Sequence, residues 1–190
     1  MSEAGRPPST SFSSINILVV DDNPANLEAF DSVIRPLGYT AFLADSGKRA
    51  LELSNHYRFS VILLDVRMPI MSGVETAVQL RKKPYGRTTP IIFVSAYDDS
   101  HVEVSRSGVD GFVSFVFSPV NAEVLAWKLQ SWVEVSVRTE MCRRQTAKVL
   151  EAQEELEKIL GKNLISESAA RQANARLATA IRLLTQSHAD

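Results

Sequence analysis

Residues 61–69 read VILLDVRMP, and this stretch decides the fold. Four consecutive apolar residues, Val61 to Leu64, form the pattern of a strand that is buried on both faces, as in a parallel sheet covered by helices. Pro69 ends the strand, because proline has no amide hydrogen to donate and restrains the residue before it. Between them lies Asp65, a single carboxylate at the end of a buried strand. In open parallel sheets, ligands bind at that edge.

Similar apolar runs occur on both sides of this stretch, separated by longer amphipathic segments. They predict strands at 17–20, 40–44, 61–64, 91–95 and 113–117, the last beginning at either Val113 or Phe115. Helices are expected at 24–37, 47–55, 73–83, 99–107 and from Ala122 onward. This alternation predicts an α/β fold with a five-stranded, doubly wound parallel sheet.

The length and composition fit one buried domain with an extension. The chain has 190 residues, of which 45% are apolar and 23% charged. Its net charge of −1 argues against generic nucleic-acid binding, and no apolar run is long enough to span a bilayer. Cys142 is the only cysteine, which excludes an intrachain disulfide and suits a reducing, cytoplasmic location. Residues 1–14, rich in Ser, Pro and Gly, are expected to be a disordered leader.

A long helical extension is expected at 136–190, after a sheet domain at 15–135. Asn121 has the character of a helix cap, and no proline follows it. Heptad spacing marks a seam through Val135, Cys142, Val149 and Leu156. A lone helix cannot bury such a stripe, so we favour a dimer-forming coiled coil over packing against its own domain. The seam weakens at Asn163 and Glu167, which leaves open a stutter in one helix or a turn to a second.

Polar residues follow three of the predicted strands. Asp21 and Asp22 follow the first strand, Asp65 follows the third, and Ser95 ends the fourth. Their side chains are expected to converge on one crevice, where the repulsion among carboxylates is relieved by a divalent cation with oxygen ligands, such as Mg²⁺. Asp65 is then the natural nucleophile toward a phosphoryl group, and the pair before it suits metal binding. Ser95 can donate a hydrogen bond to a phosphoryl oxygen.

These residues resemble a known family, the receiver domains of bacterial two-component response regulators. The resemblance covers residues 15 to about 135 and rests on LVVDD at 18–22, LLDVRMP at 63–69 with Gly73, and FVSA at 93–96. It implies that Asp65 accepts a phosphoryl group from a histidine kinase. It also implies that Asp21, Asp22 and Asp65 hold Mg²⁺, together with the backbone carbonyl of Arg67. Pro69 and the glycine would shape the loop after the phosphoacceptor.

Ser118 is the main departure from the family pattern, which places a lysine directly before the proline that is Pro119 here. No lysine occurs between Lys83 and Lys128, so no other alignment supplies one. The missing charge would pair with Asp65 or its phosphoryl group, an interaction of about 1–3 kcal/mol. Phosphorylation can then persist with weaker coupling to a change of shape.

The favoured interpretation is a signalling switch, not an enzyme that acts on a separate substrate. Phosphorylation shifts the receiver between two populations, and the C-terminal helix reports the shift through homodimerisation or by docking a downstream effector protein. No helix-turn-helix follows the receiver and the net charge is near zero, so nucleic acid is not expected as a partner. A membrane is not expected either, because no apolar run could span a bilayer. Two alternatives stay open: a non-switching pseudo-receiver that acts as a dimerisation or scaffold module, which Ser118 favours, and an N-terminal fragment of a longer signalling protein.

Overall fold

A parallel five-stranded sheet organises the described part of the chain, which in this computed structural model comprises residues 15–96, 104–105 and 107–186. The strands are β1 (Asn16–Val20), β2 (Thr40–Ala44), β3 (Val61–Asp65), β4 (Ile91–Ser95) and β5 (Val113–Phe117). Their order across the sheet is β2-β1-β3-β4-β5, so the chain changes direction across the sheet between β1 and β3. A crevice at the carboxyl ends of these two strands is the usual binding place in such sheets.

The helices alternate with the strands as the sequence predicts, and the α/β prediction is confirmed. They are α1 (Pro24–Ile34), the short 3-10 helix η1 (Arg35–Leu37), α2 (Gly47–His56), α3 (Gly73–Arg81) and α5 (Ala122–Gln186). The first helix ends before the predicted boundary because Pro36 cannot donate to the α-helical ladder, and the last turn tightens. The final strand begins at Val113, the earlier of the two expected starts. The helix expected at 99–107 falls largely outside the described residues.

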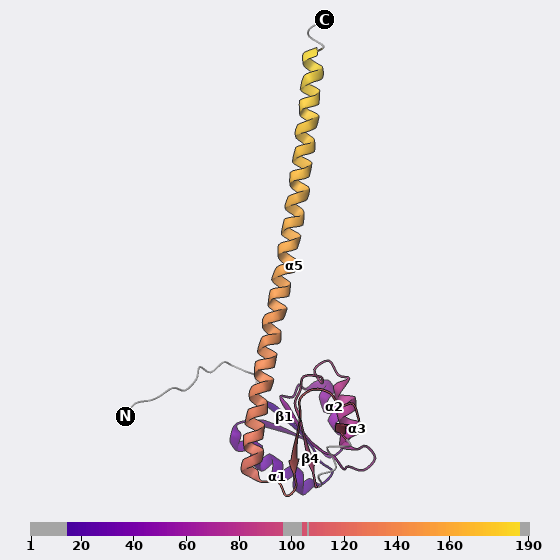
Figure 1. The fold of residues 1–190 in the computed structure, drawn as a ribbon, viewed down its shortest axis with the longest axis vertical. Helices are drawn as coiled ribbons and strands as arrows, with labels where there is room; N and C mark the ends of the chain where they lie inside the picture. The colour runs from indigo at the N-terminus through magenta and orange to yellow at the C-terminus, as the bar shows by residue number, and fades with distance from the viewer. Residues whose placement is uncertain (1–14, 97–103, 106, 187–190) are drawn as a thin grey trace, which may run out of the picture. The chain divides into compact units, whose positions relative to one another are not determined.

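Both faces of the sheet are buried, as the continuous apolar strands require. Because neighbouring strand residues point to opposite faces, Leu18 and Val20 join one core cluster, while Ile17 and Val19 join the other. Helices α2 and α3 cover the first face, and α1 with the beginning of α5 covers the second (Figure 1). The second cluster takes three residues from α5, at 0–4% exposure: Leu125, Leu129 and Val133.

Helix α5 continues without a break from Ala122 to Gln186. The weaker heptad pattern near Asn163 therefore does not mark a turn to a second helix. The chain divides into two compact units between Glu140 and Met141. Asn121 caps the helix as expected, because its side-chain oxygen accepts hydrogen bonds from the backbone N–H groups of Glu123 and Val124 at 2.9 and 3.1 Å. Among the described residues, no helix has both the length and the apolar character that crossing a bilayer requires.

Gly73 sets the distance between α3 and the end of β3. Its backbone N–H donates to the carbonyl oxygen of Val66 at 3.0 Å. A Cβ atom at this position would lie 1.9 Å from the carbonyl oxygen of Asp65, which is far inside van der Waals contact. The residue before it, Ser72, caps α3 in a reciprocal pair with Glu75. The glycine therefore lets the helix begin directly against the strand end.

We expect Gly73→Ala to lower the free energy of unfolding by about 1–3 kcal/mol, because the added methyl group must displace backbone. The matched control is Gly38→Asn. Gly38 has φ of 79°, a conformation that asparagine tolerates, and a Cβ atom at this position would have no other atom within 4 Å. The free energy of unfolding should therefore fall by less than about 0.5 kcal/mol in this control. Urea unfolding followed by circular dichroism measures both. Equal losses in the two variants would contradict the close approach at Gly73.

Candidate metal centre

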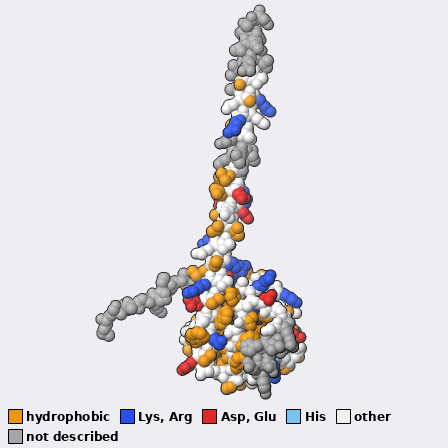
Figure 2. Space-filling model, in the orientation of Figure 1, with side chains coloured by type: hydrophobic (Ala, Val, Ile, Leu, Met, Phe, Trp, Pro, Cys, Tyr) orange, Lys and Arg blue, Asp and Glu red, His pale blue; other side chains and the backbone are white. Residues whose placement is uncertain are grey.

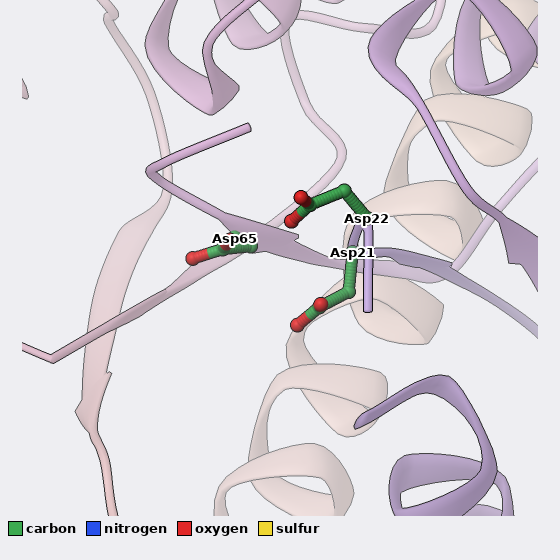
Figure 3. A group of neighbouring side chains, drawn as sticks. All are labelled: Asp21, Asp22 and Asp65. Atoms are coloured by element: carbon green, nitrogen blue, oxygen red, sulfur yellow. The ribbon is translucent and has the colours of Figure 1, made fainter. Parts of the chain in front are cut away.

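Three carboxylates meet at the crevice between β1 and β3, as the sequence predicts. Val20 pairs with Leu64 in the parallel register, so the next residues, Asp21 and Asp65, lie side by side. One oxygen from each of these two and one from Asp22 all lie within 4.8 Å of one another (Figure 3). Asp21 is buried at 1% exposure, Asp65 is partly buried and Asp22 is exposed. Hard oxygen ligands at this spacing fit a divalent cation such as Mg²⁺.

Asp21 is held in place by Asn26, a residue that the sequence reasoning did not single out. The Asn26 side-chain amide donates to both carboxylate oxygens of Asp21, at 3.1 and 3.0 Å. The backbone N–H of Asn23 donates to Oδ1 of the same carboxylate at 2.9 Å. Burial raises the pKa of Asp21, these hydrogen bonds lower it, and the neighbouring charge of Asp22 raises it again. The sequence feature that could have identified Asn26 is its place in the first turn of the helix that follows the two aspartates.

Burial raises the pKa of Asp65 to about 6, well above the ordinary value of 3.8. The backbone N–H groups of Arg67 and Val66 donate to this carboxyl and lower its pKa, whereas the charges of Asp21 and Asp22 raise it. Like charges and burial thus act together against ionisation. A cation bound among these oxygens would reverse that balance and favour the ionised form.

Ser95 lies where the sequence places it, at the end of the neighbouring strand. Asp65 pairs with Val94 in the register of β3 and β4, so Ser95 is one residue further along the same edge. It is buried at 2% exposure, and its backbone carbonyl accepts a hydrogen bond from the N–H of Ser118 at 2.8 Å. Ser95 therefore lies on the strand next to Asp65, at the same edge of the sheet.

Ser118 is exposed and follows β5 directly, next to the carboxyl end of β4. No lysine replaces it among the described residues of this edge. Lys128, the next lysine in the chain, donates instead to the hydroxyl of Ser114 at 3.1 Å. The position at which the resemblance implies a lysine thus carries a short neutral side chain.

Comparison with known proteins is consistent with this geometry. The family model for the response regulator receiver domain matches residues 17–130. The chemotaxis protein CheY4 of Vibrio cholerae has a similar structure, with 28% sequence identity and a TM-score of 0.57, over 63% of this chain and 98% of that one. The receiver domain of a sensor histidine kinase from Pseudomonas aeruginosa is 27% identical with a TM-score of 0.57, over 64% and 99% of the two chains. That structure has a magnesium ion coordinated in its active site cleft.

Sequence relatives include larger signalling proteins. Signal transduction histidine-protein kinase BarA of Shigella flexneri is 31% identical over 111 residues, which is 58% of this chain and 12% of that protein. The chain spans between 7% and 27% of the length of eight such curated relatives.

The raised pKa of Asp65 predicts a pH-dependent stability when divalent cations are removed with EDTA. Between about pH 4 and pH 6 the folded chain keeps a proton on this carboxyl that the unfolded chain has lost, so the free energy of unfolding falls as pH rises. Asp65→Asn lacks this contribution. The stability of the wild type relative to the variant should therefore decrease over that range and level off above it.

Denaturant unfolding at a series of pH values measures this difference, and Mg²⁺ provides its control. At pH 7.5, added Mg²⁺ should stabilise the wild type more than Asp65→Asn, because the ion binds the folded site. A difference between the two proteins that stays constant from pH 4 to pH 7 would contradict the raised pKa.

Proposed function

The chain belongs to the response regulator receiver domain family, and on this premise we propose that it is a phosphorylation-dependent switch in which Asp65 accepts a phosphoryl group from a histidine kinase. The observation that carries the proposal is the position of the Asp65 carboxylate, at the end of β3 with two further carboxylates within 4.8 Å. A nucleophile placed next to metal ligands is what phosphoryl transfer requires. We place this reaction in the cytoplasm.

In this proposal, a carboxylate oxygen of Asp65 attacks the phosphorus of a phosphohistidine on the kinase. An O–P bond forms, the N–P bond breaks, and its electron pair returns to the histidine nitrogen. The N–H groups of Arg67 and Val66 fix the orientation of the attacking carboxylate. The hydroxyl of Ser95, at the next strand end, donates to an oxygen of the transferred group.

Asp21, Asp22 and Asp65 would hold Mg²⁺, joined by the backbone carbonyl of Arg67. Two observations support this assignment: the carboxylate oxygens lie within one ion's reach, and the similar receiver domain from Pseudomonas aeruginosa has magnesium in its cleft. When bound, the ion would offset the negative charge of the phosphoryl oxygens. Asn26 keeps the Asp21 carboxylate in a fixed orientation through its two hydrogen bonds.

We expect the wild-type chain to gain the mass of one phosphoryl group on incubation with a small acyl phosphate and Mg²⁺, and to gain nothing without the metal. Asp65→Asn should gain nothing in either condition, because it lacks the nucleophilic oxygen. The matched control is Asp45→Asn, which removes an exposed strand-end aspartate outside the carboxylate cluster and should be labelled like the wild type. Intact-mass spectrometry, under conditions that do not hydrolyse an acyl phosphate, measures the mass gain of all three proteins.

A non-switching pseudo-receiver is the second candidate, and Ser118 is the observation that favours it. Without a positive charge at this position, the phosphoryl group lacks a partner that would pull the last strand inward. A mass gain that depends on Asp65 would show that the chain accepts a phosphoryl group, which a pseudo-receiver with an inactive site would not do. If a folded wild type shows no mass gain, Ser118→Lys tests whether the missing charge alone explains the loss.

We further propose that the output is homodimerisation through α5, with docking of a downstream effector protein. Hydrophobic side chains lie along the helix between charged ones (Figure 2), and five of them are 50–57% exposed: Val149, Leu150, Leu156, Ile159 and Leu160. Three of these fit the heptad spacing of a coiled coil: Val149 and Leu156 lie on the predicted seam, and Leu160 follows Leu156 by four residues, on the same face of the helix. A second copy of the helix is the partner that would cover this seam.

Light scattering should give about twice the chain mass of 21.0 kDa for the wild type. Leu156→Glu places a charge in the seam and should lower the mass toward the monomer. Lys158→Glu alters a charge two residues away, outside the seam, and should leave the dimer intact. Equal effects of both substitutions, or a monomeric wild type, would contradict the proposed interface.

Oxidation of Cys142 can test whether the two helices of the proposed dimer run parallel or antiparallel. It lies on the predicted seam and is exposed in the single chain, so a parallel dimer in register would bring two copies of its thiol together. Mild oxidation should then produce a covalent dimer on a non-reducing gel, and Cys142→Ser should not. A dimer that resists oxidation would indicate an antiparallel arrangement.

A further inference from the structure

A pocket lies at the opposite edge of the sheet from the carboxylates. It is formed by the segment that leads from α2 into β3 and the segment that leads from α3 into β4. These segments are neighbours because β3 and β4 pair side by side in parallel. The pocket has a volume of about 380 Å³, within the range of small-molecule sites. Nothing in the proposed phosphorylation reaction uses it.

The lining combines positive charge with aromatic rings. Arg58, Lys83 and His56 contribute the basic groups, and Tyr57 and Tyr85 contribute the rings. Among the described residues, none that lines the pocket is acidic. The chain as a whole has a net charge of −1, so the positive charge of Arg58 and Lys83 is a local concentration. Such a lining attracts an anion that also carries a flat ring.

Arg58 and Tyr85 form a stacked pair on the pocket wall. The central carbon of the guanidinium lies 3.5 Å from the centroid of the tyrosine ring, and an N–H of Arg58 also donates to the tyrosine hydroxyl. The Arg58 backbone is tied to β1, because the side-chain amide of Asn16 donates to its carbonyl oxygen at 3.2 Å. A guanidinium held over a ring keeps one planar face on which an aromatic base can stack.

The second wall is held rigid by Arg81, at the end of α3. Its guanidinium donates to the carbonyl oxygens of Gly86 and Thr89, the latter at 2.6 Å, and to that of Phe112 at 3.2 Å. Thr89 in turn donates through its hydroxyl to the carbonyl of Tyr85 at 2.9 Å. A Cβ at Gly86 would lie 1.7 Å from the carbonyl oxygen of Leu80, so only glycine allows the loop to approach this closely. The pocket is therefore preorganised, which lowers the entropic cost of binding.

We propose that this pocket binds a nucleotide, with the base stacked against the Arg58–Tyr85 pair and the phosphate near Lys83 and His56. Aromatic stacking accounts for the rings, and charge-assisted hydrogen bonds account for the basic groups. An inorganic anion would pair with the basic side chains but would make no stacking contact with the tyrosine rings. A volume of about 380 Å³ suits a small molecule better than a nucleic-acid strand.

Isothermal titration calorimetry tests the proposal with AMP and GMP as probes, and with adenosine, guanosine and inorganic phosphate as their parts. All titrations contain EDTA, which prevents Mg²⁺-dependent binding at the carboxylates. The full chain is compared with Arg58→Gln, and with Arg49→Gln as a matched control. Arg49 is exposed on α2, pairs with Glu52 and does not line the pocket. Circular dichroism establishes that each variant is folded.

We expect at least one nucleotide to bind more tightly than its nucleoside and more tightly than phosphate. Arg58→Gln should weaken that binding roughly tenfold to a hundredfold, and Arg49→Gln should leave it unchanged. The absence of binding by both nucleotides at millimolar concentration would overturn the proposal, as would an affinity for phosphate equal to that of the nucleotides. Equal losses in the two arginine variants would also overturn it, because binding would then reflect general surface charge.

Discussion

Asp21, Asp22 and Asp65 hold carboxylate oxygens within 4.8 Å of one another, and their mutual repulsion raises the free energy of the folded chain when all three are ionised. The parallel pairing of β1 with β3 imposes this arrangement, because it aligns the ends of both strands at one edge. Hydrogen bonds from Asn23 and Asn26 offset part of the cost at Asp21. The repulsion that remains favours a positive charge beside the three carboxylates. A divalent cation bound among the three carboxylates would meet that preference.

Helix α3 connects the two edges of the sheet. It begins at Gly73, where the backbone has no room for a side chain beside the carbonyl of Asp65, and it ends at Arg81, whose guanidinium fixes the loops at the other edge. A packed helix transmits displacement because close-packed interiors do not deform continuously. In the proposed switch, a movement at the end of β3 on phosphorylation would therefore reach Gly73, the first residue of this helix. The carboxylate site and the basic pocket share this one rigid element.

The sequence predicted the parts of the fold that depend on local periodicity. Runs of mainly apolar residues predicted all five strands, and parallel topology then brought Asp21 and Asp65 to one edge. It could not identify contacts set by the reach of a side chain across the fold. Arg81, for example, binds the carbonyl of Phe112, 31 residues away, and no periodicity encodes that separation. The continuity of α5 past the polar seam residues was also undecided, because heptad matches do not distinguish a stutter from a turn.

In the proposed switch, the neutral side chain of Ser118 would limit how much a phosphoryl group on Asp65 shifts the conformation. A modification moves an equilibrium only by the difference in its interaction energy with the two states. A charge-assisted contact made in one state alone, worth about 1–3 kcal/mol, corresponds to a factor of about 5 to 150 in that equilibrium. With serine here, that factor would have to come from Ser95, from the proposed metal ligands, or from the proposed dimer. In a dimer, two receivers act on one helical pair, so a small bias in each adds to the free energy of the assembly. Dimerisation through α5 would thus supply the coupling that Ser118 does not.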